Sequence, residues 1–206
     1  MSKTLVVYGT RPEYLKVKPI LKDNPSLHSL FIKQHVDIIN FGKPTHSVEV
    51  DNVCGNRLNS IFQQILLKTE DIIDKYTNII VQGDTATVAA VALVAYNLKK
   101  NIFYVESGLR SFDLENPFPE EGYRQMVSRI ATVNLCPTDL SSKNLKNENV
   151  LGDIFVTGNT VLDNLIQHKK DAFYGKDILV TLHRNENLHL LKEWLETIDS
   201  IAKKHI

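Results

Sequence analysis

The sequence is poor in the features that mark several classes of protein. It contains only two cysteines, Cys54 and Cys136, which lie far apart and outside any CxxC pair. This spacing argues against a disulfide framework and a cysteine-rich zinc site, so we expect two reduced thiols and no bound metal. Lysine plus arginine and aspartate plus glutamate both total 24, which leaves no basic excess for binding nucleic acid.

Long apolar runs are also missing. The first one covers only Leu5 to Val7, which is too short for a signal peptide. The longest apolar helix-like stretch, Val88 to Leu98, is well under the roughly 20 residues that a membrane span needs. We therefore expect a cytoplasmic protein without a membrane segment. The sequence also lacks GxGxxG, GxxxxGK[ST], HExxH and GxSxG, so neither a standard dinucleotide fingerprint nor a P-loop is present.

Ordinary globular composition remains, because 43% of the 206 residues are hydrophobic and 23% are charged. Apolar runs with strand character alternate with helix-like runs along the chain. Such apolar strands are typical of a parallel sheet covered on both faces, which predicts a doubly wound Rossmann-like α/β fold. The expected strands are 4–8, 27–33, 78–82, 102–105, 133–136, 154–157 and 178–182, the expected helices are 11–22, 56–76, 85–99, 119–131, 140–147, 160–170 and 188–204, and residues 34–50 read as irregular.

A boundary is expected near residues 172–176. We predict a Rossmann-like domain over 1–172, and in 173–206 a linker with one strand-helix unit. One such unit cannot form a domain by itself. It either extends the first sheet or begins a second domain.

Polar residues follow nearly every expected strand. In a parallel sheet the carboxyl ends of the strands share one edge, where ligands bind and helix N-termini favour an anion. Each residue also has a structural interpretation, since Asp84 can cap a helix, Glu120 can complement a helix dipole, and a lone His183 is more often structural than catalytic. Glu106 is harder to explain in this way, because it ends an apolar strand where no cap is needed. The strand exits are Gly9-Thr10-Arg11, Gln34-His35, Gly83-Asp84-Thr85, Glu106-Ser107-Gly108-Leu109-Arg110, Gly158-Asn159-Thr160 and His183-Arg184-Asn185-Glu186-Asn187.

Six strings in this order resemble the non-hydrolysing UDP-N-acetylglucosamine 2-epimerases. They span nearly the whole chain, and the resemblance implies one half of a GT-B-like architecture, in which two Rossmann-like domains enclose the site. The strings are Gly9-Thr10-Arg11-Pro12-Glu13 with Lys16 and Pro19, Gln82-Gly83-Asp84-Thr85, Val105-Glu106-Ser107-Gly108-Leu109-Arg110, Pro117-Phe118-Pro119-Glu120-Glu121 with Arg124-Gln125, Val156-Thr157-Gly158-Asn159-Thr160, and Thr181-Leu182-His183-Arg184.

The resemblance implies an isomerase that interconverts UDP-GlcNAc and UDP-ManNAc. In this family UDP is eliminated to leave a 2-acetamidoglucal and is then added back with the opposite configuration at C2. Such a reaction needs acid/base groups and positive charge for the departing diphosphate, but no redox cofactor. The implied catalytic residues are Asp84, Glu106, Glu120 and His183, and the implied substrate-binding residues are Arg11, Lys16, His35, Arg110 and Arg184.

Two other functions stay open at this point. One is a non-catalytic remnant that binds a UDP-sugar or serves in assembly, and the other is a GT-B glycosyltransferase-like relative, because a fold does not fix a function. Members of the family continue into a full second domain, whereas this sequence stops at Ile206. We therefore expect a homodimer or a separate chain that supplies the second domain, and weak activity of this chain alone.

Overall fold

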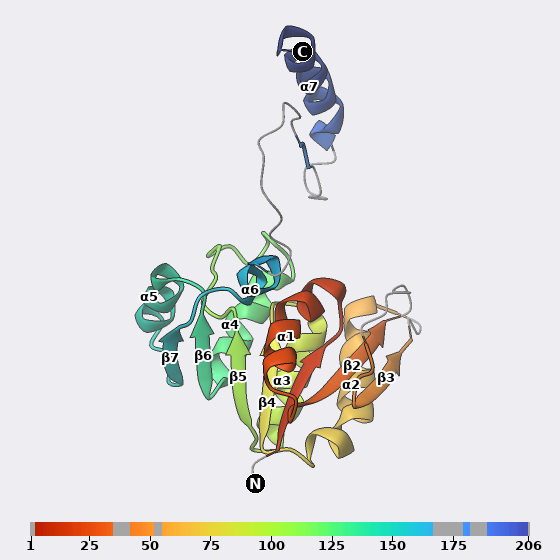
Figure 1. Cartoon of the computed structure of the whole chain (residues 1–206), viewed down its shortest axis with the longest axis vertical. Helices are drawn as coiled ribbons and strands as arrows, with labels where there is room; N and C mark the ends of the chain where they lie inside the picture. Colours follow the sequence, from red (N-terminus) through yellow and green to blue (C-terminus); the bar gives the residue numbers. More distant parts are fainter. Residues whose placement is uncertain (1–2, 35–41, 52–54, 167–178, 182–188, 206) are drawn as a thin grey trace. The chain divides into compact units, whose positions relative to one another are not determined.

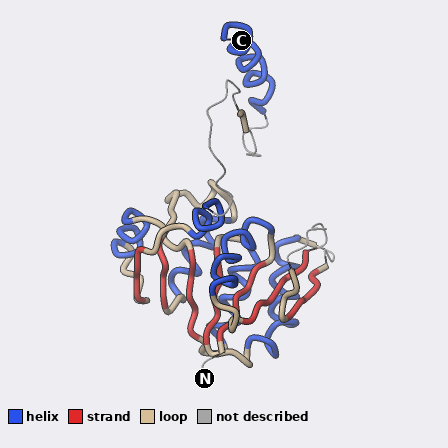
Figure 2. Tube along the Cα trace, in the orientation of Figure 1, coloured by secondary structure: helices blue, strands red, loops and turns tan. Residues whose placement is uncertain are grey.

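The computed structural model describes residues 3–34, 42–51, 55–166, 179–181 and 189–205. The chain divides into two units, Met1–Lys169 and Lys170–Ile206, which are described separately here. The first unit holds a parallel sheet with helices on its faces (Figures 1 and 2).

Seven strands form this sheet in the order β3-β2-β1-β4-β5-β6-β7, and every neighbouring pair is parallel. Their carboxyl ends therefore share one edge. The strand order reverses at β1, because the chain first builds outward to β2 and β3 and then returns to place β4 on the other side of β1. The bounds are β1 Thr4–Tyr8, β2 His28–Gln34, β3 His46–Val50, β4 Asn78–Gln82, β5 Asn101–Val105, β6 Val133–Cys136 and β7 Asp153–Val156.

Side chains of β1 alternate between two apolar layers, as the pleat of a strand requires. Leu5 and Val7 belong to the larger buried cluster, which α2, α3 and α4 complete. Val6 and Tyr8 belong to the smaller cluster on the other face, together with Val17 of α1. Both faces of the sheet are thus covered, as a doubly wound fold requires. The helices are α1 Arg11–Asp23, α2 Arg57–Ile73, α3 Ala86–Asn97, α4 Glu120–Ile130, α5 Asp139–Asn147 and α6 Thr160–Ile166.

Helix α3 packs against both α2 and α4, and nearly all of its residues before Tyr96 are buried. Its buried residues include five alanines, whose small side chains let three helices lie close together on one face. The turn after β1 also comes close to this helix. A Cβ on Gly9 would lie 2.8 Å from Thr87 Oγ1, so no larger residue fits there without displacement.

The fold predicted from the sequence is confirmed, with two differences. Residues 34–50 were expected to be irregular, but His46–Val50 forms the edge strand β3 with alternating buried side chains. Such a short, half-polar strand gives little apolar signal. The strand expected over 178–182 is not seen in residues 179–181, for which the described part of the chain offers no pairing strand; residues 178 and 182 lie outside that part.

In the second unit, the described residues form α7, Leu191–His205, preceded by one short turn. Within the described part of the chain, no helix combines the length and the apolar character that crossing a membrane takes.

Candidate functional site

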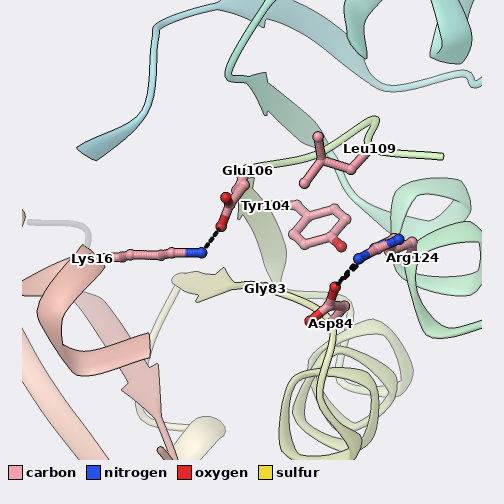
Figure 3. A pocket seen from close by; sticks show the side chains of 7 residues that line it. All are labelled: Lys16, Gly83, Asp84, Tyr104, Glu106, Leu109 and Arg124. Atoms are coloured by element: carbon pink, nitrogen blue, oxygen red, sulfur yellow. Dashed lines mark hydrogen bonds and ion pairs between the residues drawn. The ribbon is translucent and has the colours of Figure 1, made fainter. Parts of the chain in front are cut away.

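A pocket of about 170 Å³ opens at the carboxyl edge of the sheet (Figure 3). Strands β1 and β4 diverge there into connections on opposite sides, which is the place where open α/β sheets bind ligands. Residues from α1, from the exits of β4 and β5 and from α4 contribute to the pocket. The lining residues are Lys16, Gly83, Asp84, Tyr104, Glu106, Leu109 and Arg124.

Glu106 is the first residue after β5, and its backbone adopts a left-handed φ of 65°. This conformation is uncommon for a residue with a side chain and often accompanies functional sites. Three side chains from three other elements fix the carboxylate, which is 12% exposed. Lys16 of α1 and Gln82 of β4 donate to Oε2, and Asn159 Nδ2 donates to Oε1 over 3.0 Å.

Asp84 lies across the pocket from Glu106, in the turn between β4 and α3 (Figure 3). Arg124 of α4 holds its Oδ2 through two nitrogens, with Nε at 2.8 Å and a terminal nitrogen at 2.6 Å. The nearby charge of Asp84 raises the pKa of Arg124, against the lowering effect of burial. The pocket thus contains two carboxylates, each paired with one cation.

Tyr104 of β5 forms part of the pocket floor and is 1% exposed. Burial, reinforced by the charge of Asp84, raises the pKa of its hydroxyl. The phenol is therefore neutral at physiological pH and can only donate or accept a hydrogen bond.

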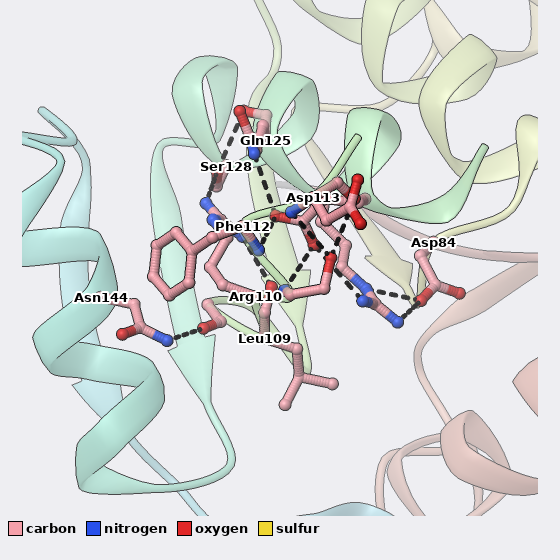
Figure 4. Close-up of polar contacts among 12 residues, drawn as sticks. Asp84, Leu109, Arg110, Phe112, Asp113, Gln125, Ser128 and Asn144 are labelled. Atoms are coloured by element: carbon pink, nitrogen blue, oxygen red, sulfur yellow. Dashed lines mark hydrogen bonds and ion pairs between the residues drawn. The ribbon is translucent and has the colours of Figure 1, made fainter. Parts of the chain in front are cut away.

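Glu121 was not among the predicted site residues, yet its carboxylate organises the long loop after Glu106. Figure 4 labels Phe112 and Asp113 of this loop. It is fully buried and accepts hydrogen bonds from the backbone N–H groups of Ser111 and Phe112 and from the Gln125 amide. Burial alone would raise the pKa of Glu121, but these hydrogen bonds and the charge of Arg110 outweigh it, so the pKa is lowered. The residue acts as an ionised anchor for residues 111–112.

Glu120 lies one position earlier, at the first residue of α4, and it is not among the residues that line the pocket. Its Oε2 is buried and accepts no hydrogen bond from the described residues. Its Oε2 is therefore an unused acceptor on α4, the helix that also contributes Arg124 to the pocket. The catalytic role of Glu120 stays a prediction.

The N–H groups of the turn before α1 are engaged within the protein. Glu13, only 3% exposed, accepts hydrogen bonds from Gly9 N at 2.5 Å and Thr10 N at 3.1 Å. It also accepts one from Thr85 Oγ1 at 2.6 Å, which links the turns after β1 and β4. Burial raises the pKa of Glu13 more than these bonds lower it. The neighbouring Arg11 is exposed at the start of α1.

Arg110 lies in one of the matched strings, but its guanidinium is held inside the protein (Figure 4). Its side chain is fully buried and makes a two-pronged ion pair with Glu148, at 2.7 and 2.9 Å. It also donates to Ser128 Oγ at 2.7 Å and to the Leu109 carbonyl at 2.9 Å. These four contacts occupy the guanidinium, so the structure does not bring Arg110 to the pocket.

Three of the predicted residues, His35, His183 and Arg184, lie outside the described residues. The structure brings together Lys16, Asp84 and Glu106, and it adds Arg124, Gln82 and Asn159, which the sequence reasoning did not select. All three added residues lie within the strings that resemble the epimerase family, so that resemblance could have identified them as site residues. Among the described residues, no three His, Cys, Asp or Glu side chains come together as a metal site would require.

Comparison with known proteins gives the site its context. The sequence model of the family described as UDP-N-acetylglucosamine 2-epimerase matches residues 26–206. The chain belongs to this family. It is similar to the UDP-N-acetylglucosamine 2-epimerase of Salmonella borreze, with 34% identity over 100% of this chain and 63% of that protein. It is also similar to the Bacillus subtilis UDP-N-acetylglucosamine 2-epimerase, with 35% identity over 90% of this chain and 55% of that protein.

Solved structures of family members agree with the fold. The UDP-GlcNAc 2-epimerase of Methanocaldococcus jannaschii has a TM-score of 0.77 and 31% identity, covering 100% of this chain and 63% of its own. The Neisseria meningitidis enzyme, solved with bound UDP-GlcNAc, has a TM-score of 0.73 and 30% identity, covering 80% of this chain and 48% of its own. The chain thus spans 48–63% of the length of these relatives, and it has the Rossmann-like part of a GT-B-like fold.

Proposed function

We propose that this family member takes part in the interconversion of UDP-GlcNAc and UDP-ManNAc, with chemistry at the pocket between Asp84 and Glu106. One observation carries the proposal: two carboxylates, each held by its own cation, lie in one pocket at the strand-order reversal. Inversion at C2 requires that a proton leave one face of the sugar and return to the other. Two positioned acid/base groups can perform these transfers.

The positive charges have a second task in this proposal. When the C1–O bond to UDP breaks, the diphosphate leaves with the bonding electrons, and nearby cations stabilise its charge. Lys16 lines the pocket and Arg11 lies five positions earlier, at the exposed start of the same helix. We assign Arg11, Lys16, His35 and Arg184 to substrate binding and Asp84, Glu106, Glu120 and His183 to catalysis. Arg110 is left out, because its guanidinium is already engaged.

The proposal also includes the division of the chain into a domain over 1–172 and a linker with a strand-helix unit over 173–206. A pocket of about 170 Å³ is smaller than the roughly 300–1,000 Å³ of typical ligand sites. The residues that line it can therefore surround only part of a nucleotide sugar. We propose that further walls come from a second copy or from a separate chain, and that the protein acts in the cytoplasm.

The same small volume favours one alternative, a module that binds a UDP-sugar without turnover. The two functions are separated by incubating the 206-residue chain with UDP-GlcNAc in D₂O. NMR then detects UDP-ManNAc and deuterium at C2. Turnover supports the epimerase. Calorimetric binding without either product, both for this chain alone and with a chain that supplies the further walls, supports the module and contradicts the proposal.

Catalytic roles are tested by Asp84→Asn and Glu106→Gln. In an assembly that is active as wild type, each variant should lower turnover about 100-fold or more, as loss of general acid/base catalysis does. Asp74→Asn and Glu49→Gln are matched controls, since both carboxylates make exposed ion pairs outside the pocket. Full activity of either pocket variant would remove that residue from the mechanism.

A further inference from the structure

Gln82 has a buried side-chain amide in which the nitrogen makes a hydrogen bond and the oxygen makes none with the described residues. The residue is 1% exposed, and its Nε2 donates to Glu106 Oε2. Its Oε1 is buried as well, but it accepts no hydrogen bond from the described residues. Leaving a buried acceptor without a donor destabilises a fold, so such an atom requires an explanation. One explanation is a donor that is present only in another state of the site.

Asn159 is the natural comparison, because it donates to the other oxygen of the same carboxylate. Its Nδ2 lies 3.0 Å from Glu106 Oε1, while its Oδ1 accepts from Val161 N at 3.0 Å. Turning this amide over would break both bonds and place a donor against a donor. Turning the amide of Gln82 breaks only one bond and directs an unused acceptor at Glu106.

The protonation state of Glu106 decides which of these orientations is favourable. An ionised carboxylate only accepts hydrogen bonds, whereas a protonated one also donates. We propose that Gln82 is a positioning residue that follows the protonation of Glu106, donating through Nε2 to the carboxylate and accepting through Oε1 from the carboxylic acid. This inference deepens the proposed function, since only an acid/base group needs a partner in both states.

Other charged groups around Glu106 do not replace this role. Lys16 of α1 contacts Oε2 and favours the ionised form, and Arg124 of α4 does so from across the pocket. Asp84 favours the protonated form, although Arg124 neutralises much of its charge. Tyr104 of β5 is neutral at physiological pH. Lys16 and Arg124 can only donate and an ionised Asp84 can only accept, whereas the amide of Gln82 can exchange the two roles by rotation. The hydroxyl of Tyr104 could also exchange them, but among the described contacts Glu106 is hydrogen-bonded to Lys16, Gln82 and Asn159.

The test uses the full 206-residue chain and needs no turnover. NMR of ¹⁵N-labelled glutamine amides and ¹³C-labelled glutamate carboxyls is recorded from about pH 2 to about pH 7, a range that brackets ordinary carboxyl titration. We expect the Gln82 amide signals and the Glu106 carboxyl signal to move with one common midpoint. Glu106→Gln, which like a carboxylic acid both donates and accepts, should hold the Gln82 signals at their acid limit. Gln82 signals that stay constant while Glu106 titrates, as a fixed water on Oε1 would cause, overturn the inference.

Two near-isosteric variants separate a rotating amide from a fixed one. Asn159→Leu removes a donor to Oε1 whose hydrogen bond is stronger when Glu106 is ionised, so the Glu106 midpoint should rise by about one pH unit. Gln82→Met removes a hydrogen-bond partner from both the ionised and the protonated form of Glu106. The Glu106 midpoint should therefore move less than half as far as it does in Asn159→Leu. Equal rises would show that Gln82 is a fixed donor. If Gln82→Met does not fold, the spectra of the wild type and of Glu106→Gln still show whether the Gln82 amide follows the protonation of Glu106. These spectra do not depend on turnover, so absence of epimerase activity would refute the proposed function and leave the inference about Gln82 unchanged.

Discussion

Removing the charge of Glu148 is the sharpest test of the assignment of Arg110 to the interior. In Glu148→Gln the shape is kept, but the fully buried guanidinium of Arg110 loses the carboxylate that it contacts at 2.7 and 2.9 Å. Ser128 Oγ, the Leu109 carbonyl and the single amide oxygen of the new side chain remain as acceptors, but all are neutral and the amide NH₂ meets a guanidinium donor. Breaking a buried pair by neutralising one partner costs about 3–5 kcal/mol, because a buried charge is left without compensation.

That loss is a large share of the roughly 5–15 kcal/mol that stabilises a typical domain. For a chain of this size each kcal/mol lowers Tm by about 2–4 °C, so we expect a fall of roughly 6–20 °C in calorimetry or in a thermal melt followed by circular dichroism. Glu49→Gln is the matched control. Its ion pair with Lys33 is 64% exposed on the glutamate side, and such pairs contribute about 0–1 kcal/mol. A fall below about 2 °C in Glu148→Gln, equal to the control, would show that Arg110 is free for another role.

The pKa of Glu13 is raised by burial, so the folded state holds its proton to higher pH than the unfolded state does. The free energy of unfolding of the wild type, relative to that of Glu13→Gln, should therefore fall as pH rises above about 4.3, the ordinary pKa of glutamate. Urea titrations at several pH values measure this difference, and a difference that grows with pH would contradict the reasoning. Gly108→Ala should cost about 2–5 kcal/mol in the same assay, because φ is +86° and the new Cβ would lie 2.3 Å from the Ser141 carbonyl oxygen. In Gly122→Ala the new Cβ would have no heavy atom within 4 Å, so this substitution should stabilise α4 by about 0.5–1 kcal/mol. An equal effect of the two glycine substitutions would refute the steric argument.

The sequence was sufficient for the sheet and for the edge that holds the pocket, because apolar strands and helical periodicity are local signals. It placed Asp84 and Glu106 at strand ends, and the parallel order then brought them to one pocket. The edge strand β3 was not predicted, because two of its five residues carry polar side chains that point to solvent. A strand of this kind is defined by its partner β2 and not by its own composition.

The two arginines of the matched strings show what local patterns cannot decide. Arg110 follows the exit of β5 and Arg124 lies in α4, and one pairs with Glu148 in the interior while the other pairs with Asp84 in the pocket. The partner Glu148 lies 38 positions away from Arg110, so the choice depends on tertiary packing. Glu120 and Glu121 differ for a simpler reason. Successive residues on a helix point about 100° apart, so only one of them can reach residues 111–112.

Charge at the pocket explains why binding and chemistry need different residues. Asp84 and Glu106 balance Lys16 and Arg124, so the lining offers no excess positive charge to a diphosphate. The N–H groups of Gly9 and Thr10, in the turn before α1, are already engaged by the carboxylate of Glu13. In the proposed reaction the diphosphate would therefore need cations beyond the lining in addition to Lys16, and the exposed Arg11 is one of them. What the balanced pocket supplies instead is a pair of carboxylates in fixed positions. This arrangement suits proton transfer at a sugar carbon better than it suits capture of a nucleotide.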